Sequence, residues 1–124
     1  MSRIESAIRV VVQYSEAFNR HDAEGILRLL CEDCVLEGSH PPPDGSRCSG
    51  REEAAAFWRE LFRASPDLSL EVEELFGLGL RCVLRWKRTW TDADGAKRHL
   101  RGADVFKVRN GLICEWLSYA KAQG

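Results

Sequence analysis

One carboxylic acid, Asp104, stands in the most regular strand-like segment of the chain, residues 101–111. Apolar and polar residues alternate along this segment, and Asn110-Gly111 at its end is typical of a tight hairpin turn. If Phe106 faces a hydrophobic core, the two-residue period of a strand turns Asp104 to the same side. Burial would then raise the pKa of this carboxyl group and favour the neutral acid. The alternative is a shifted register that leaves Asp104 exposed on a strand edge.

Tyr14 and His40 are the side chains that could share proton chemistry with Asp104. Tyr14 lies on a helical stripe with Val11 and Phe18, so its hydroxyl group is either buried, where it needs a partner, or at the rim in water. His40 precedes the prolines at 41–43, whose rigidity could hold the imidazole in place. Histidine titrates near neutral pH and so suits general-base catalysis. The alternative for His40 is a ring in solvent beside a surface loop.

Two helices are expected to position these residues from the N-terminal side. The apolar spacing predicts a helix that begins with a capping box of Ser2 and Glu5 and runs through Phe18. A second, short helix is capped by Asp22 and ends near residues 31–34.

A third helix and a run of strands complete the expected fold. Ser49 and Glu52 form the capping box of a helix that runs to about residue 63. Strands are expected at 35–38, 68–73, 81–91, around Asp104 and at 112–121, with turns at 77–79 and 92–95. Helices followed by a meander of antiparallel strands predict an α+β fold.

A strongly curved sheet closed over by helices would leave a conical cavity. Alternation turns side chains 84, 86 and 88 to one face of their strand, and 116 and 118 to one face of theirs. Aromatic residues at such spacing are more often plain core than cavity lining. If Arg88 pairs with Asp104, it would lower the pKa of that carboxyl group and keep it ionised. The expected substrate-binding residues are Phe18, Trp58, Phe62, Leu84, Trp86, Arg88, Trp116 and Ser118.

Composition excludes several classes of protein. The chain has 124 residues, of which 44% are hydrophobic, and a net charge of −1, which fits a single domain over residues 1–124 and no nucleic-acid or membrane surface. It carries neither a bilayer-length apolar run nor a signal-peptide pattern, so a cytoplasmic location is expected. Five cysteines cannot all pair within one chain, and Cys31 and Cys34 lack the second half of a zinc site. No metal is expected, and without a phosphate-binding glycine loop no cofactor is either.

Three segments resemble the SnoaL-like group of the nuclear-transport-factor-2-like superfamily. They are residues 14–30, with Phe18-Asn19-Arg20-His21-Asp22 and then Gly25-Ile26; Gly50-Arg51-Glu52-Glu53 followed by Ser65-Pro66-Asp67-Leu68; and residues 101–111. The resemblance runs nearly end to end. It implies a cone-shaped α+β barrel of the cystatin-like kind, in which a strongly curved, mixed or antiparallel sheet wraps around the N-terminal helices.

The resemblance also implies a chemistry, best compared with ketosteroid isomerase. In that enzyme a tyrosine and a protonated aspartic acid donate hydrogen bonds to an enolate oxygen while a second carboxylate shuttles the proton. Tyr14 falls at the tyrosine position and Asp104 at the acid position, but the base position falls on Gly38, which has no side chain. Cyclase-like relatives imply instead that Asp104 is itself the acid and base, and His40 is a substitute base in either scheme.

Three functional readings follow. One is a cofactor-free isomerase, cyclase or dehydratase that moves a proton on an apolar carbonyl substrate. The second is a domain of the same fold that binds an apolar small molecule without catalysis. The third is a dimerisation domain whose cavity is filled by its own tryptophans. The family usually forms homodimers through the outer sheet face, where Val83, Val105, Ile113, Leu117 and Tyr119 are expected here.

Overall fold

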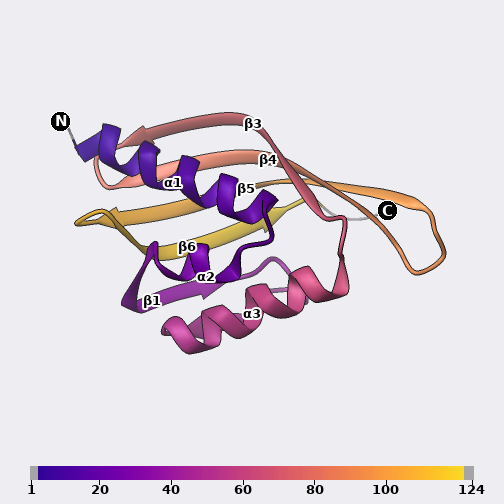
Figure 1. Ribbon diagram of the computed structural model, residues 1–124. Coiled ribbons are helices and arrows are strands. Elements are labelled where there is room, and N and C mark those ends of the chain that lie inside the picture. Colours follow the sequence, from indigo (N-terminus) through magenta and orange to yellow (C-terminus); the bar gives the residue numbers. More distant parts are fainter. Residues whose placement is uncertain (1–2, 122–124) are drawn as a thin grey trace.

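The computed structural model describes residues 3–121 and has an α+β fold, in which the helices lie against one face of a curved, unclosed sheet (Figure 1). A concave sheet face covered by amphipathic helices buries the apolar side of both layers. The elements in chain order are α1 (Arg3–Asn19), α2 (Ala23–Leu27), β1 (Leu30–Glu37), β2 (Arg47–Ser49), α3 (Arg51–Ala64), β3 (Ser69–Leu78), β4 (Arg81–Thr91), β5 (Lys97–Arg109) and β6 (Leu112–Ala120).

The six-stranded sheet has the order β2-β1-β6-β5-β4-β3. β1 runs parallel to β6, whereas the other neighbours are antiparallel, so the sheet is mixed. β4 and β5 pair along their whole length, from Arg81 opposite Lys107 to Thr91 opposite Lys97. Their hairpin extends beyond the other strands (Figure 1).

Helix α1 lies across the sheet with Val11, Tyr14 and Phe18 fully buried, so the stripe faces inward as predicted. The Tyr14 hydroxyl group lies in the interior, although its position on the helix had favoured the rim. Its last residue, Asn19, fastens it to β3: the side-chain amide donates to the carbonyl oxygen of Leu70 at 2.9 Å and accepts from the Leu70 N–H at 2.7 Å. The expected capping box of Ser2 and Glu5 lies outside the residues and side chains that the structure describes.

The prediction for the second helix is right at its start and wrong at its end. Asp22 caps α2 by accepting from the Gly25 N–H at 2.9 Å. The helix stops at Leu27, however, and β1 already begins at Leu30, so Cys31 and Cys34 lie in a strand. The cause is long-range: β1 pairs with β6, the last strand in the chain, and such a pairing leaves no local signal.

The entry to α3 also differs from the prediction. Residues 47–49 form strand β2 against β1, and the helix is capped by Gly50 rather than Ser49. Glu53, and not Glu52, accepts a hydrogen bond from the Ser49 N–H at 2.8 Å. The turn expected at 77–79 is displaced as well, because β3 continues to Leu78.

A bulge in β6 overturns one of the expected surface residues. The register shifts so that Val108 pairs with Ile113 and Lys107 with Glu115, which leaves Cys114 as an extra residue. As a result Ile113 is only 1% exposed and belongs to the core, not to the outer face.

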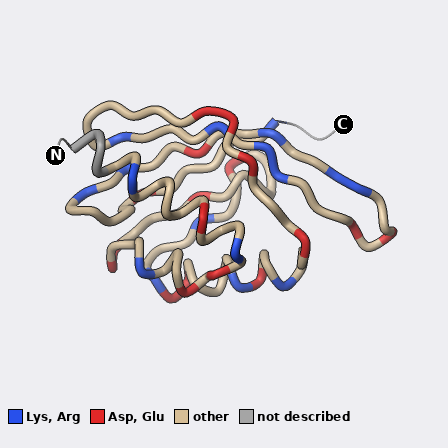
Figure 2. The backbone as a smooth tube through the Cα atoms, turned by 45° about the horizontal axis from the view of Figure 1, so that its top comes forward, with Lys and Arg blue, Asp and Glu red and all other residues tan. Residues whose placement is uncertain are grey.

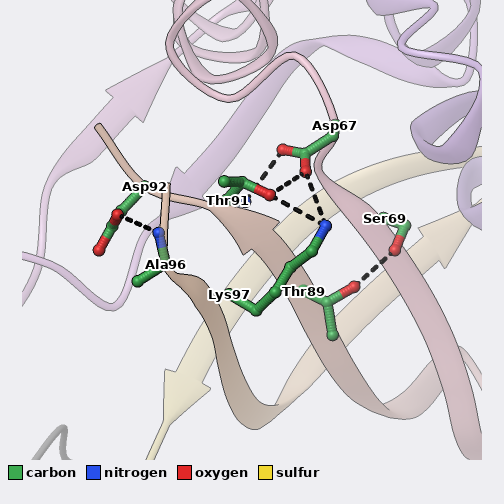
Figure 3. Close-up of polar contacts among 7 residues, drawn as sticks. All are labelled: Asp67, Ser69, Thr89, Thr91, Asp92, Ala96 and Lys97. Carbon is green, nitrogen blue, oxygen red and sulfur yellow. Dashed lines mark hydrogen bonds and ion pairs between the residues drawn. The ribbon is translucent and has the colours of Figure 1, made fainter. Parts of the chain in front are cut away.

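Polar contacts tie the β4–β5 hairpin to the segment that enters β3 (Figure 3). Asp67 accepts from the N–H and the hydroxyl group of Thr91, at 3.0 and 2.6 Å, and the hydroxyl groups of Ser69 and Thr89 lie 2.8 Å apart. Basic and acidic residues are interspersed over the chain (Figure 2). No helix in the described part is both long and apolar enough to cross a membrane.

Candidate active site

Asp104 is fully buried in the middle of the sheet, which selects the first of the two alternatives left by the sequence. It faces the helices from β5, between Leu84 of β4 and Ser118 of β6 in the strand register. The indole N–H of Trp116 donates to its Oδ2 at 3.0 Å, while Oδ1 has no hydrogen-bond partner among residues 3–121. The carboxyl group is therefore held on one side and free on the other.

Burial raises the pKa of Asp104, because the interior penalises the ionised form. The positive charge of Arg88 and the nearby polar groups of Ser118, Trp86 and Trp116 lower the pKa, but desolvation outweighs them. The neutral acid, which can donate a hydrogen bond, is favoured.

Tyr14 reaches the same region from α1 and is also fully buried. Its ring packs edge-on against Phe106 and Trp58, with centroids 5.2 and 6.0 Å away. Burial raises the pKa of its hydroxyl group, and a charge on Asp104 would raise it further. Arg88 and the indole groups of Trp58 and Trp116 oppose this effect, although none of them hydrogen-bonds to the hydroxyl group. The phenol therefore remains a neutral donor.

Arg88 does not form the ion pair with Asp104 that the sequence left open. Its guanidinium group lies over the rings of Trp86 and Phe18, 4.4 and 5.1 Å from their centroids. Such cation–π contacts attract the charge without using the N–H groups. Nε and Nη2 are buried and have no hydrogen-bond partner in the described chain.

Gly102 positions Trp86 and was not assigned this role from the sequence. A Cβ atom at residue 102 would lie 2.5 Å from Cζ2 of Trp86 and 2.4 Å from the carbonyl oxygen of Tyr119. The indole ring of Trp86 can lie over β5 only because residue 102 has no side chain. A glycine inside a long strand is the one signal that could have indicated this close approach.

Several buried polar atoms around Asp104 share the lack of a partner. We call this group the polar cluster. Buried polar atoms are satisfied in the great majority of cases, so this concentration of exceptions makes the region the candidate site. The cluster contains more hydrogen-bond donors than acceptors, which suits a ligand rich in oxygen. They are Tyr14 Oη, Trp58 Nε1, Trp86 Nε1, Arg88 Nε and Nη2, Asp104 Oδ1 and Ser118 Oγ.

Contacts link the expected binding residues into one continuous set. Phe18 packs on Tyr14 and Phe62, and Trp58 packs on both Tyr14 and Trp116. Except for the half-buried Arg88, these residues are at most 7% exposed, so the site is closed to solvent in this conformation. A ligand enters only if some of these side chains move.

His40 is not brought to this site. β1 ends at Glu37, so the alternation that would have turned residue 40 inward stops before it, and the His40 ring is exposed. Gly38, the residue that the resemblance aligned with the base, is buried beside Phe57 and Ser46. A groove of about 430 Å³ lies between this loop and the end of β6, and its lining includes Gly38 and Ser118.

A metal centre is not visible in the described part of the chain, where no three His, Cys, Asp or Glu side chains cluster. The cysteines are free thiols, and Cys31 and Cys34 remain two separate strand residues.

The fold and the site define the class of protein. The model of the SnoaL-like domain family matches residues 11–116, and the chain belongs to this family, within the nuclear-transport-factor-2-like fold. No curated protein matches the sequence.

Solved structures support the same class. A nuclear-transport-factor-2-like protein of unknown function from Mesorhizobium loti is 30% identical over 98% of this chain and 96% of that one, with a TM-score of 0.84. A candidate polyketide cyclase from Xanthomonas campestris is 26% identical over 97% and 93% of the two chains, with a TM-score of 0.80. A candidate ketosteroid isomerase from Kribbella flavida shares the fold at 22% identity, covering 100% and 84%, with a TM-score of 0.83.

Proposed function

We propose that this chain binds an apolar small molecule through a carbonyl oxygen and moves a proton on the carbon beside it, as in isomerisation, cyclisation or dehydration. The observation that carries the proposal is a buried carboxyl group with a raised pKa and a free oxygen, beside a buried phenol. Both groups are donors in their neutral forms.

In the proposed reaction Asp104 and Tyr14 donate hydrogen bonds to the substrate carbonyl oxygen. When a proton leaves the adjacent carbon, the electron pair of the broken C–H bond shifts toward that oxygen, which becomes negatively charged. Fixed donors in a dry site stabilise this charge more strongly than they stabilise the neutral substrate, so they lower the barrier. Trp116 holds Asp104 in place through its hydrogen bond to Oδ2.

The proposed reaction also needs a base that accepts the proton from the substrate carbon. Gly38 has no side chain, His40 is exposed, and Asp104 is the one carboxyl group found buried within residues 7–121. We therefore assign the acceptor role to a water molecule that enters with the substrate or to a basic group of the substrate itself.

The second candidate is binding without catalysis, and the missing base favours it. In that case the same site holds an apolar ligand by its oxygen, and no bond changes.

Exchange of carbon-bound hydrogen with solvent tests catalysis without knowledge of the natural substrate. We expect the protein to accelerate the exchange of deuterium from D₂O into the position beside the carbonyl group of 2-tetralone, followed by NMR. Asp104→Leu should abolish the acceleration, and Asp94→Asn, which changes an exposed carboxyl group on the hairpin turn, should not.

Binding is measured separately with 2-naphthol, whose oxygen on a fused ring system imitates an enolate. We expect quenching of tryptophan fluorescence, and a Kd at least about tenfold weaker in Asp104→Leu, as for loss of one strong hydrogen bond. Binding with no exchange would select the second candidate. A Kd that Asp104→Leu leaves unchanged would overturn both.

We also propose a homodimer formed through the outer sheet face. Phe76, Val83, Val105 and Leu117 stand opposite one another in register and make an apolar row across four strands. Phe76 is 49% exposed and the nearby Tyr119 60% exposed. A continuous apolar row of this kind supports a protein contact.

A further inference from the structure

We infer that the ligand of the polar cluster carries a carboxylate group, and that Arg88 binds this group at the edge of the site. The inference rests on the proposed function and adds to it the chemical class of the ligand: an apolar body with an acceptor oxygen at one end and a carboxylate at the other.

Arg88 differs from three exposed arginines of strands β4 and β5. Arg81, Arg85 and Arg101 are exposed, and each forms an ion pair with a glutamate. Arg88 is half-buried, yet no acidic side chain of the described chain pairs with it. A guanidinium group is always charged, and a buried charge normally requires a partner of opposite sign. Arg88 is thus more buried than these three arginines and, unlike them, has no counter-charge in the described chain.

The two free atoms of Arg88 are a matched pair. Nε and Nη2 lie on the same edge of the guanidinium plane and together fit the two oxygens of a carboxylate. Arg63 uses this same pair to hold Glu60, with Nε on Oε2 at 2.9 Å and Nη2 on Oε1 at 2.5 Å. Arg88 presents this edge, buried and unoccupied by protein acceptors.

The charges around Arg88 also favour an anion. The guanidinium carbon lies over the rings of Phe18 and Trp86, while Nε and Nη2 have no protein acceptor. Asp104 is the nearby carboxyl group; it forms no ion pair with Arg88, and burial raises its pKa. The remaining polar cluster consists mainly of donors. The region therefore attracts negative charge on the ligand.

We choose the length of the probe ligands from the strand register. Asp104 is level with Leu84, and Trp86, on which Arg88 stacks, is the next inward-facing residue along β4. Two residues of a strand span about 7 Å, which is close to the length of a fused bicyclic ring.

A pair of probes isolates the carboxylate. 2-Naphthol and 6-hydroxy-2-naphthoate share the ring and the hydroxyl group, and the second adds a carboxylate at the far end. We expect the naphthoate to bind the wild-type protein about ten- to hundredfold more tightly at pH 7, the range for a charge-assisted hydrogen bond. The 7-hydroxy isomer, measured in parallel, presents the carboxylate at a second angle.

Variants of Arg88 test whether this residue causes the tighter binding of the naphthoate. Arg88→Met retains a packing chain over the two rings and should abolish the preference for the naphthoate, so that the ratio of the Kd values for 2-naphthol and the naphthoate falls to about one. Arg88→Lys should retain part of it, because lysine keeps the charge but loses the two-pronged edge. The matched control is Arg85→Met, an exposed arginine on the opposite face of β4, which should keep the full preference.

Thermal unfolding without ligand gives a second measurement. Removal of an unpaired, partly buried charge should leave the Tm of Arg88→Met equal to or above that of the wild type, whereas a structural arginine would lower it. The inference is overturned if neither naphthoate gains affinity over 2-naphthol, or if the gain survives in Arg88→Met. Asp104-dependent binding of 2-naphthol would then still support the proposed function, so the two failures are distinguishable.

Discussion

The protonation of Asp104 couples the site to the stability of the protein. An aspartic acid in the unfolded chain titrates near pH 3.9, and burial raises the pKa of Asp104 in the folded state. Between these two pKa values the unfolded chain loses its proton and the folded one keeps it, so the free energy of unfolding falls as the pH rises. This residue therefore destabilises the fold at neutral pH.

An Asp104 variant that cannot ionise should lose this pH dependence. Asp104→Asn keeps the shape and an acceptor for the Trp116 N–H but cannot ionise, so it removes the penalty. Its Tm should be close to that of the wild type near pH 4 and exceed it increasingly toward neutral pH, until the folded pKa is passed. Thermal unfolding from pH 4 to 8 checks this; a Tm difference that stays constant or shrinks as the pH rises would contradict it.

Gly102 allows strand β5 to pack closely against Trp86. Gly102→Ala would force the β5 backbone away from Trp86 and from the Tyr119 carbonyl oxygen, both of which lie inside contact distance of the new methyl group. We expect a loss of about 1–3 kcal/mol in the free energy of unfolding, typical of overpacking, and a changed near-ultraviolet circular dichroism spectrum as Trp86 moves. Unchanged urea unfolding together with an unchanged spectrum would show that the strand absorbs the methyl group freely.

Sequence patterns predicted the helices and strands that are determined by residues close together in the sequence. The bounds of β4, Arg81–Thr91, are confirmed, because eleven residues of alternation and a polar hairpin turn are local signals. Asp22 as a helix cap and the Tyr14 stripe are confirmed for the same reason. The inward orientation of Asp104 follows from the same period of two.

The remainder depends on partners distant in sequence. β1 owes its start at Leu30 to β6, and the bulge that buries Ile113 arises from pairing with β5. His40 was expected inward only on the assumption that its strand continued, and β1 ends at Glu37. The role of Gly102 needed the position of a side chain on the neighbouring strand.

The apolar row on the outer face makes a prediction for the whole molecule. If the row is a dimer interface, a charge at its centre should disrupt the contact while the core remains intact. We expect the wild type to sediment as a dimer at micromolar concentration and Val105→Lys as a monomer. Val12→Lys, at a 38% exposed position on α1, is the control and should remain dimeric. A monomeric wild type would rule out the proposed interface.

The proposed chemistry depends on a neutral carboxylic acid in the interior beside a neutral phenol. Carbon-13 NMR of protein labelled at the aspartate carboxyl carbons measures this directly, with Asp104→Asn identifying the resonance. The account predicts that the Asp104 signal titrates well above the range of exposed aspartates, which lies near pH 4, or stays protonated throughout. An Asp104 resonance that titrates at or below that range would contradict it.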